Sequence, residues 1–165
     1  MYWFCALPLL LLAELIAIVL APILPLFAKD GRLPAWLDWF QTPDNSLYGD
    51  AGHQARWAGR PLYLQQMMWL MRNRAYGLKL GPFGADPRPY RLYGTADIGN
   101  RNSYKRGWFF ILNDYGFWYF KCVFPITQSY CLQLAFGWQL DAPMLGRHIY
   151  MFSPRITRYY GKRPS

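Results

Sequence analysis

The 165-residue sequence predicts an α+β protein: an N-terminal transmembrane-type helix, then a small domain of amphipathic helices and an antiparallel aromatic β-meander. Three observations predict this class. The first 28 residues are almost wholly apolar, residues 61–76 have helical apolar spacing, and the chain from residue 108 onward alternates with a period of two. We therefore expect an apolar helix at 1–28, an interfacial helix and turn region at 29–60, and a basic α+β domain with a basic tail at 61–165.

Residues 1–28 are long enough to cross a membrane, because about 20 helical residues span a hydrocarbon core roughly 30 Å thick. Two other interpretations stay open. A cleaved signal peptide would carry a positively charged start, and no cation precedes Lys29. A core hairpin, or packing inside a protein assembly, becomes possible if the three prolines of the segment break the helix.

The residues at the two ends of the apolar segment predict its orientation. Aromatic side chains favour membrane interfaces, and Lys and Arg collect on the cytoplasmic side. Both nearby cations lie after the segment, so we expect the N-terminus outside and the body in the cytoplasm, where Cys122 and Cys131 would be free thiols. The expected membrane-interface residues are Trp3, Lys29, Arg32, Trp36, Trp39 and Phe40.

Glu14 is the one charged residue of the apolar segment. Near the centre of a bilayer a carboxylate costs a few kcal/mol unless it is protonated or paired. We treat Glu14 as a candidate intramembrane polar contact, either between copies or toward a lumen. The alternative is a single polar group that a strongly apolar helix tolerates.

Two stretches of the body have helical spacing. Residues 33–40 suit a short helix that lies in a membrane interface or packs on the domain, with one face formed by Leu33, Trp36, Leu37 and Phe40. Residues 61–76 begin at Pro61, and we expect Gly77 to end this helix in the left-handed conformation. We expect its apolar stripe in the core rather than in a binding groove; the stripe comprises Leu64, Met67, Met68, Met71 and Ala75.

A loop rich in Pro and Gly at 81–91 separates the helical half from a predicted sheet. We expect strands at 108–113, 117–124, 130–139 and 147–152, with a three-residue connection between the first two. Alternation places one set of mainly aromatic side chains on a common face, which we predict to be the core. Cys122 belongs to this set and Cys131 to the opposite face, so the two thiols should not meet.

The body is strongly basic. Residues 29–165 hold all 18 Lys and Arg against eight Asp and no Glu, which gives a formal charge of +10. Such a field favours phosphate-bearing partners, either nucleic acid or anionic lipid. The tail from residue 153 interleaves cations with aromatic rings, which suits either partner or a merely solvated tail. Its candidate anionic-partner contacts are Arg155, Arg158, Tyr159, Tyr160, Lys162 and Arg163.

No recognised catalytic or cofactor-binding motif occurs in the sequence. A Gly-x-Ser-x-Gly elbow, a phosphate-binding Gly-rich loop, CxxC and HExxH are all missing. Asp44, Asp50 and His53 match no zinc or calcium spacing and suit turn hydrogen bonds instead. An enzyme would need Asp141 and His148 together in a cleft. We therefore expect no enzyme, no metal, no cofactor and no small-molecule substrate.

Two blocks of the sequence are specific enough to compare with known families. Residues 39–45 read Trp-Phe-Gln-Thr-Pro-Asp-Asn, and residues 73–77 read Asn-Arg-Ala-Tyr-Gly. Together with Gly107-Trp108 and Phe136-Gly137-Trp138, they resemble a family of small proteins encoded by tailed bacteriophages. The resemblance covers most of the chain and implies a phage origin, with no catalytic residue to transfer.

These observations lead to one expected function and two alternatives. We expect a phage-encoded, membrane-associated, non-enzymatic interaction or assembly protein that acts at the host inner membrane and contacts a host or phage protein. The first alternative is a virion structural or ejected internal protein packed near the portal or tail. The second is a nucleic-acid-binding module that uses the basic body.

Overall fold

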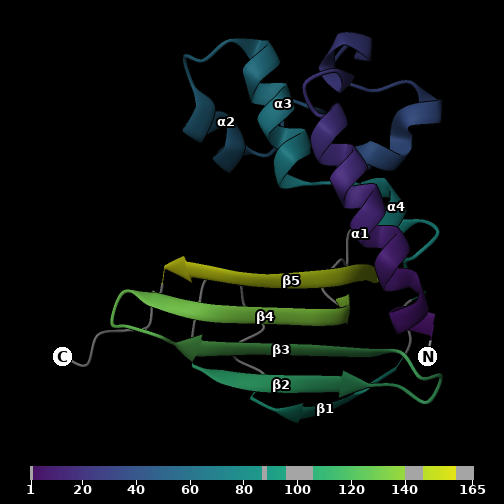
Figure 1. Cartoon of the computed structure of the whole chain (residues 1–165), viewed down its shortest axis with the longest axis vertical. Helices are drawn as coiled ribbons and strands as arrows, with labels where there is room; N and C mark the ends of the chain where they lie inside the picture. Colours follow the sequence, from purple (N-terminus) through teal and green to yellow (C-terminus); the bar gives the residue numbers. More distant parts are fainter. Residues whose placement is uncertain (1, 87–88, 96–105, 140–146, 159–165) are drawn as a thin grey trace. The chain divides into compact units, whose positions relative to one another are not determined.

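The computed structural model describes residues 2–86, 89–95, 106–139 and 147–158. These residues form helices and a five-stranded antiparallel sheet, so the chain is an α+β protein with an apolar N-terminal helix (Figure 1).

The chain divides into two units, Met1–Phe83 and Gly84–Ser165. The boundary falls inside the loop predicted at 81–91. The divisions predicted after residues 28 and 60 remain predictions.

The first unit is helical. Its core joins the end of the first helix to three later segments and consists of Ala21, Leu24, Leu33, Leu37, Leu47, Trp69 and Leu70. The hydroxyl of Tyr63 also ties this region together, because it donates a hydrogen bond to the carbonyl oxygen of Pro22 at 2.5 Å. The elements of the unit are α1 (Tyr2–Leu20), η1 (Leu24–Phe27), η2 (Ala35–Phe40), α2 (Ala51–Trp57), α3 (Leu62–Arg72) and α4 (Tyr76–Leu80), where η denotes a 3-10 helix.

The prediction of a single helix at 61–76 is wrong, because the chain forms two helices in this region. α3 ends at Arg72, Ala75 has a left-handed φ of 46°, and Gly77 lies inside α4. Packing explains the position of Gly77, since a Cβ there would lie 2.2 Å from the carbonyl oxygen of Asp38 in η2. The residues of α3 that are buried are Gln66, Trp69 and Leu70, with Met67 and Met71 partly buried against the core.

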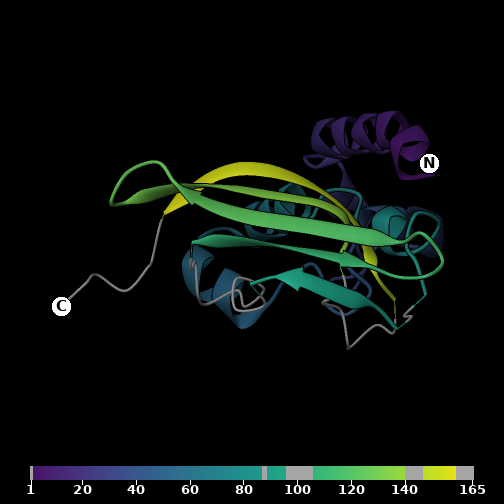
Figure 2. The same ribbon diagram turned by 90° about the horizontal axis from the view of Figure 1, so that it is seen from below.

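The second unit is an antiparallel meander in which neighbouring strands follow one another in the chain. Figure 2 shows that its longest strands bow along their length. The strands predicted at 108–113, 117–124 and 130–139 are confirmed to within one residue at each end. The last strand begins and ends later than predicted, so residues 153–158 belong to the sheet rather than to a tail. The strands are β1 (Arg91–Gly94), β2 (Gly107–Leu112), β3 (Trp118–Pro125), β4 (Tyr130–Gln139) and β5 (Ile149–Arg158).

The more deeply buried face of the sheet is the opposite of the predicted one. Cys131 is fully buried, whereas Cys122 is only partly buried. Both faces of these strands are mainly apolar, so alternation shows which side chains share a face but not which face is covered. The buried face also includes several small side chains and accepts two polar ones, Lys121 and Gln133. Its buried apolar residues are Phe109, Ile111, Tyr119, Val123, Cys131, Ala135 and Ile149.

The predicted core face, here called the aromatic face, is partly open. Strand pairing places Trp108 opposite Cys122, Phe110 opposite Phe120, and Phe124 opposite Leu132, so these residues share that face. Trp138 and Tyr150 at one end of it are buried, but exposed large side chains lie along the rest. The exposed members are Tyr93, Trp108, Leu112, Phe124, Tyr130 and Ile156.

Candidate membrane-binding surface

The side chains of α1 divide by exposure between two sides of the helix. The inner side carries the buried residues Trp3, Ala6, Leu10 and Ala17. The outer side carries large apolar residues, all exposed: Phe4, Leu9, Leu11, Leu12, Leu15, Ile16 and Val19. A helix of a soluble domain turns most of its large apolar residues toward the core, whereas seven large apolar residues of α1 are exposed.

Length and composition make α1 a candidate for crossing a membrane. Among the described helices, Trp3–Leu20 is the one stretch that is long and apolar enough to span a bilayer. A signal sequence or the core helix of a soluble protein would meet the same test. A core helix would be mostly buried, however, and only 22% of this stretch is buried.

Exposed apolar residues continue beyond α1 into the two 3-10 helices. Leu26 and Phe27 of η1 are exposed, as are Trp36 and Trp39 of η2. The rings of Phe27 and Trp36 meet edge to face, with their centroids 6.0 Å apart. Sequence analysis singled out the two tryptophans but missed Leu26 and Phe27, although both lie in the predicted apolar segment. We call the outer side of α1 together with these four residues the outer apolar surface.

The remaining predicted interface residues are placed differently from one another. Trp3 is buried, and Phe40 is half-buried against the core of the first unit. Lys29 and Arg32 are exposed, and their backbones form two hydrogen bonds of 2.9 Å across a tight turn. The guanidinium of Arg32 donates to the carbonyl oxygens of Thr42 and Pro43, each at 3.3 Å. The turn thus holds two cations together at the end of the apolar segment.

Glu14 has charged partners inside its own unit. Its side chain is 13% exposed and forms ion pairs with Lys79 of α4 and, at 3.6 Å to Nε, with Arg74. Burial lowers the pKa of Lys79, and Arg74 lowers it further, while Glu14 opposes the shift. Sequence analysis did not identify these partners, because only the tertiary packing brings α4 to the middle of α1.

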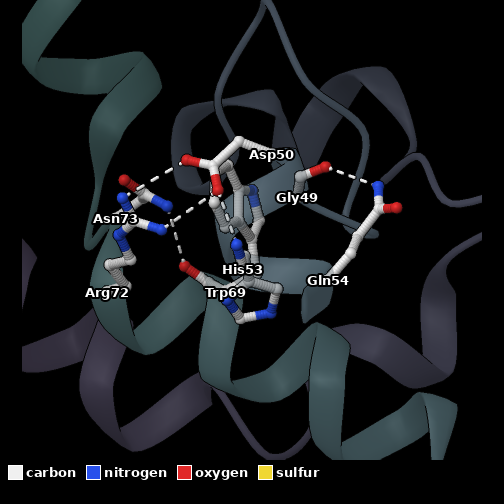
Figure 3. A network of polar contacts seen from close by, with 7 residues as sticks. All are labelled: Gly49, Asp50, His53, Gln54, Trp69, Arg72 and Asn73. Carbon is white, nitrogen blue, oxygen red and sulfur yellow. Dashed lines mark hydrogen bonds and ion pairs between the residues drawn. The ribbon is translucent and has the colours of Figure 1, made fainter. Parts of the chain in front are cut away.

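A second polar network belongs to the architecture of the first unit (Figure 3). Asp50 caps α2 by accepting a hydrogen bond from the backbone N–H of His53 at 2.7 Å, and it pairs with Arg72 at 3.3 Å. Burial raises the pKa of Asp50, but the His53 hydrogen bond and the Arg72 charge outweigh it, so the net shift is downward. The buried ring of His53 contacts Trp69 at 5.1 Å between centroids, and its Nε2 lies 2.9 Å from the carbonyl oxygen of Gln65.

Asp50 hydrogen-bonds to the nearby backbone, as expected, but it does so as the N-cap of α2, a helix that the sequence analysis did not predict. In the part of the chain that the structure describes, no group of three His, Cys, Asp or Glu side chains is placed to hold a metal ion. The ion pair and the ring contact of this network link α2 and the residue before it to α3.

The predicted contacts in β5 and beyond are described only in part. Arg155 is exposed, and its Nε donates to Oε1 of Gln133 at 2.8 Å. Arg158 ends β5, but its side chain lies outside the described residues. His148 is buried, and its backbone pairs with that of Ala85. The other predicted residues lie outside the described ranges: Asp141, Tyr159, Tyr160, Lys162 and Arg163.

Comparison with known proteins places the chain in a family. A family model matches residues 1–157, which include the first unit and almost all of the sheet. The chain belongs to the DUF7338 family. The DUF7338 description is a family of unknown function, and no curated protein or solved structure matches the chain. The function of this DUF7338 protein therefore has to be argued from its own geometry, and its phage origin stays a prediction.

Proposed function

We propose that this protein is a membrane-associated, non-enzymatic interaction or assembly protein that attaches to lipid through the outer apolar surface. The exposure of α1 carries the proposal, because seven large apolar residues are exposed on one side of the helix, whereas the buried side carries Trp3, Ala6, Leu10 and Ala17. Exposed apolar patches of this kind are typical of surfaces that meet a membrane or another protein. Aromatic rings at the end of the patch suit a membrane interface, which favours lipid.

The apolar area is large enough for attachment. Full burial of a large apolar side chain contributes about 1.5–3 kcal/mol, so each of the seven half-exposed residues on α1 gains about 1 kcal/mol in lipid. Their sum is on the order of 7 kcal/mol. A single myristoyl chain gives only marginal membrane binding, with an association constant of about 10⁴ M⁻¹. The outer side of α1 by itself is thus of the same order as a one-chain lipid anchor.

The ion pairs of Glu14 favour attachment along the membrane over a crossing. If the outer side of α1 enters lipid while its inner side stays on the first unit, Glu14 keeps both Lys79 and Arg74. A crossing helix, with the N-terminus outside and the body in the cytoplasm, would either separate these charges or draw α4 into the bilayer. Each choice exposes charge to hydrocarbon at a cost of several kcal/mol.

The site of action in this proposal is the host inner membrane, where the protein would contact a host or phage protein. This part rests on the resemblance to proteins of tailed bacteriophages. Mass spectrometry of purified phage particles separates it from the virion alternative. We expect the chain to be absent from particles. Its presence in stoichiometric amounts would instead support the virion alternative.

Liposome flotation tests the attachment. The chain is synthesised in a cell-free system with liposomes of phosphatidylcholine and phosphatidylglycerol, and we expect the wild type to float with them. The double variant Leu11→Asp, Leu15→Asp should remain at the bottom, because each Asp costs about 3 kcal/mol in the apolar phase.

A matched control places two Asp residues on the exposed side of α2. Ala51→Asp, Ala55→Asp adds the same charge at the same spacing, and this variant should float like the wild type. Wild-type protein that stays soluble beside the liposomes, or a Leu11, Leu15 double variant that floats unchanged, would contradict the proposal.

A further inference from the structure

One strongly exposed ring lies on the aromatic face in each of four consecutive strands. Tyr93 of β1 is 47% exposed, Trp108 of β2 51%, Phe124 of β3 63% and Tyr130 of β4 48%. Other rings of this face, such as Phe110 and Phe120, are only partly exposed. The exposed rings are therefore a distinct set, and their positions can be compared through the strand register.

The register places the four rings on a diagonal across the sheet. Each ring is displaced from the previous one by a single strand and two residues, as shown by the pairings Tyr93↔Phe110, Trp108↔Cys122 and Phe124↔Leu132. Diagonal neighbours on one face of an antiparallel sheet lie about 7–8 Å apart. We call this set the aromatic diagonal. Its spacing gives each ring room for one planar partner.

The charge of the second unit selects the kind of partner. Residues 84–165 contain eleven Lys and Arg against four Asp, a formal charge of +7, while residues 1–83 contain seven against five, a formal charge of +2. The five described strands contain no acidic residue. Arg91 is exposed at the start of β1, and Arg106 is exposed one residue before β2. A partner that offers both planar rings and negative charge fits this surface.

We propose that the aromatic diagonal binds single-stranded nucleic acid, with bases stacked on its rings and phosphates near Arg91 and Arg106. Aromatic side chains on an antiparallel sheet stack successive bases in RNA-binding domains, and stacking of this kind tolerates any sequence. A duplex keeps its base faces inside the stack, so the partner is single-stranded. A neutral glycan could stack on the rings, but it carries no negative charge that could pair with the cations of the unit.

Fluorescence anisotropy with the full chain in mild detergent tests the proposal. The probes are fluorescein-labelled oligothymidine and a labelled duplex of the same length. We expect the single strand to bind more tightly than the duplex, and its affinity to fall between about 50 and 200 mM salt as phosphate contacts are screened. Trp108→Leu, Phe124→Leu should weaken binding at least about tenfold, because two stacked bases are lost while the apolar character is kept.

The matched control is Tyr115→Leu. Tyr115 is 68% exposed and lies in the turn between β2 and β3, away from the diagonal. This variant should bind within about twofold of the wild type. Equal binding by the Trp108, Phe124 double variant, equal affinity for the duplex, or no binding at low salt would each overturn the proposal.

Ultraviolet cross-linking uses the wild-type chain, so its result does not depend on whether a variant folds. Cross-linked oligothymidine should map by mass spectrometry to peptides that contain Trp108, Phe124 or Tyr130. Cross-links confined to the first unit would overturn the assignment. Because Leu11→Asp, Leu15→Asp changes only α1, this variant should keep its affinity for the oligonucleotide, so failure of membrane attachment and failure of this proposal can be distinguished.

Discussion

The two units of the chain expose apolar surface in different electrostatic surroundings. In the first unit the exposed side chains of α1 are mostly aliphatic, and the one carboxylate of the helix faces inward to Lys79 and Arg74. In the second unit the exposed side chains are largely aromatic, Arg91 and Arg106 are exposed beside β1 and β2, and the described strands contain no acidic residue. Uncharged aliphatic surface suits hydrocarbon, whereas rings among cations suit stacked bases and phosphates. We therefore expect different partners for the two surfaces.

The largest expected effect concerns the inner side of α1. Glu14→Leu leaves Lys79 partly buried without its counter-charge, so we expect the free energy of unfolding of the first unit to fall by about 3 kcal/mol. Adding Lys79→Met should recover most of this loss. Urea unfolding of the full chain in detergent, followed by tryptophan fluorescence, measures both. An equal loss in the double variant would show that the ion pair does not hold α1 in place.

The second prediction concerns the backbone of the sheet. Gly137 has a φ of +102°, and a Cβ there would lie 2.2 Å from the carbonyl oxygen of Trp118. Gly116 has a φ of +80° but no atom within 4 Å of such a Cβ. Gly137→Ala should therefore destabilise the second unit by about 2 kcal/mol more than Gly116→Ala. Thermal unfolding followed by circular dichroism compares the two variants, and equal losses would contradict the register of β3 and β4.

Thiol labelling tests which face of the sheet is covered. Cys5 is exposed on α1, Cys122 is partly buried and Cys131 is buried, and burial raises the pKa of the Cys122 and Cys131 thiols. A higher pKa means less reactive thiolate at neutral pH. A water-soluble maleimide, with labelled peptides quantified by mass spectrometry, should therefore label Cys5 at least about tenfold faster than Cys131, with Cys122 between them. Liposomes should slow Cys5 alone. Faster labelling of Cys131 than of Cys122 would instead support the sequence-based prediction, in which the face that carries Cys122 is the buried one.

The smallest expected effect lies in the α2 cap. Asp50→Ala removes the hydrogen bond to the His53 backbone and should cost about 1 kcal/mol at neutral pH. The pKa of Asp50 is lowered in the folded chain, so the carboxylate stabilises the fold above its unfolded pKa of 3.8 and loses this contribution as the pH falls through the lower folded pKa. The difference from wild type should therefore vanish in acid. Urea unfolding across this range measures it, with Asp44→Ala as an exposed control that should change little.

The sequence predicts the elements of this fold better than their packing. An apolar run and two-residue alternation depend on local chemistry, and they predict an N-terminal apolar helix and most strands, although α1 ends at Leu20 rather than at residue 28. The buried face of the sheet could not be predicted, because Cys131, Ala135 and Val123 are also apolar and a single strand does not show what covers it. The partners of Glu14 and the left-handed Ala75 depend on where α4 packs. Neither follows from local spacing.

Spin-label accessibility tests membrane attachment through α1 most directly. Single labels at Leu12 and Val19, on the outer side of α1, are compared in liposomes with a label at Ala55 on the exposed side of α2. We expect the two α1 labels to collide more with oxygen, which concentrates in lipid, and the Ala55 label to collide more with a water-soluble nickel complex. Leu12 and Val19 labels that remain as accessible to the nickel complex as Ala55 would contradict insertion of this surface into the membrane.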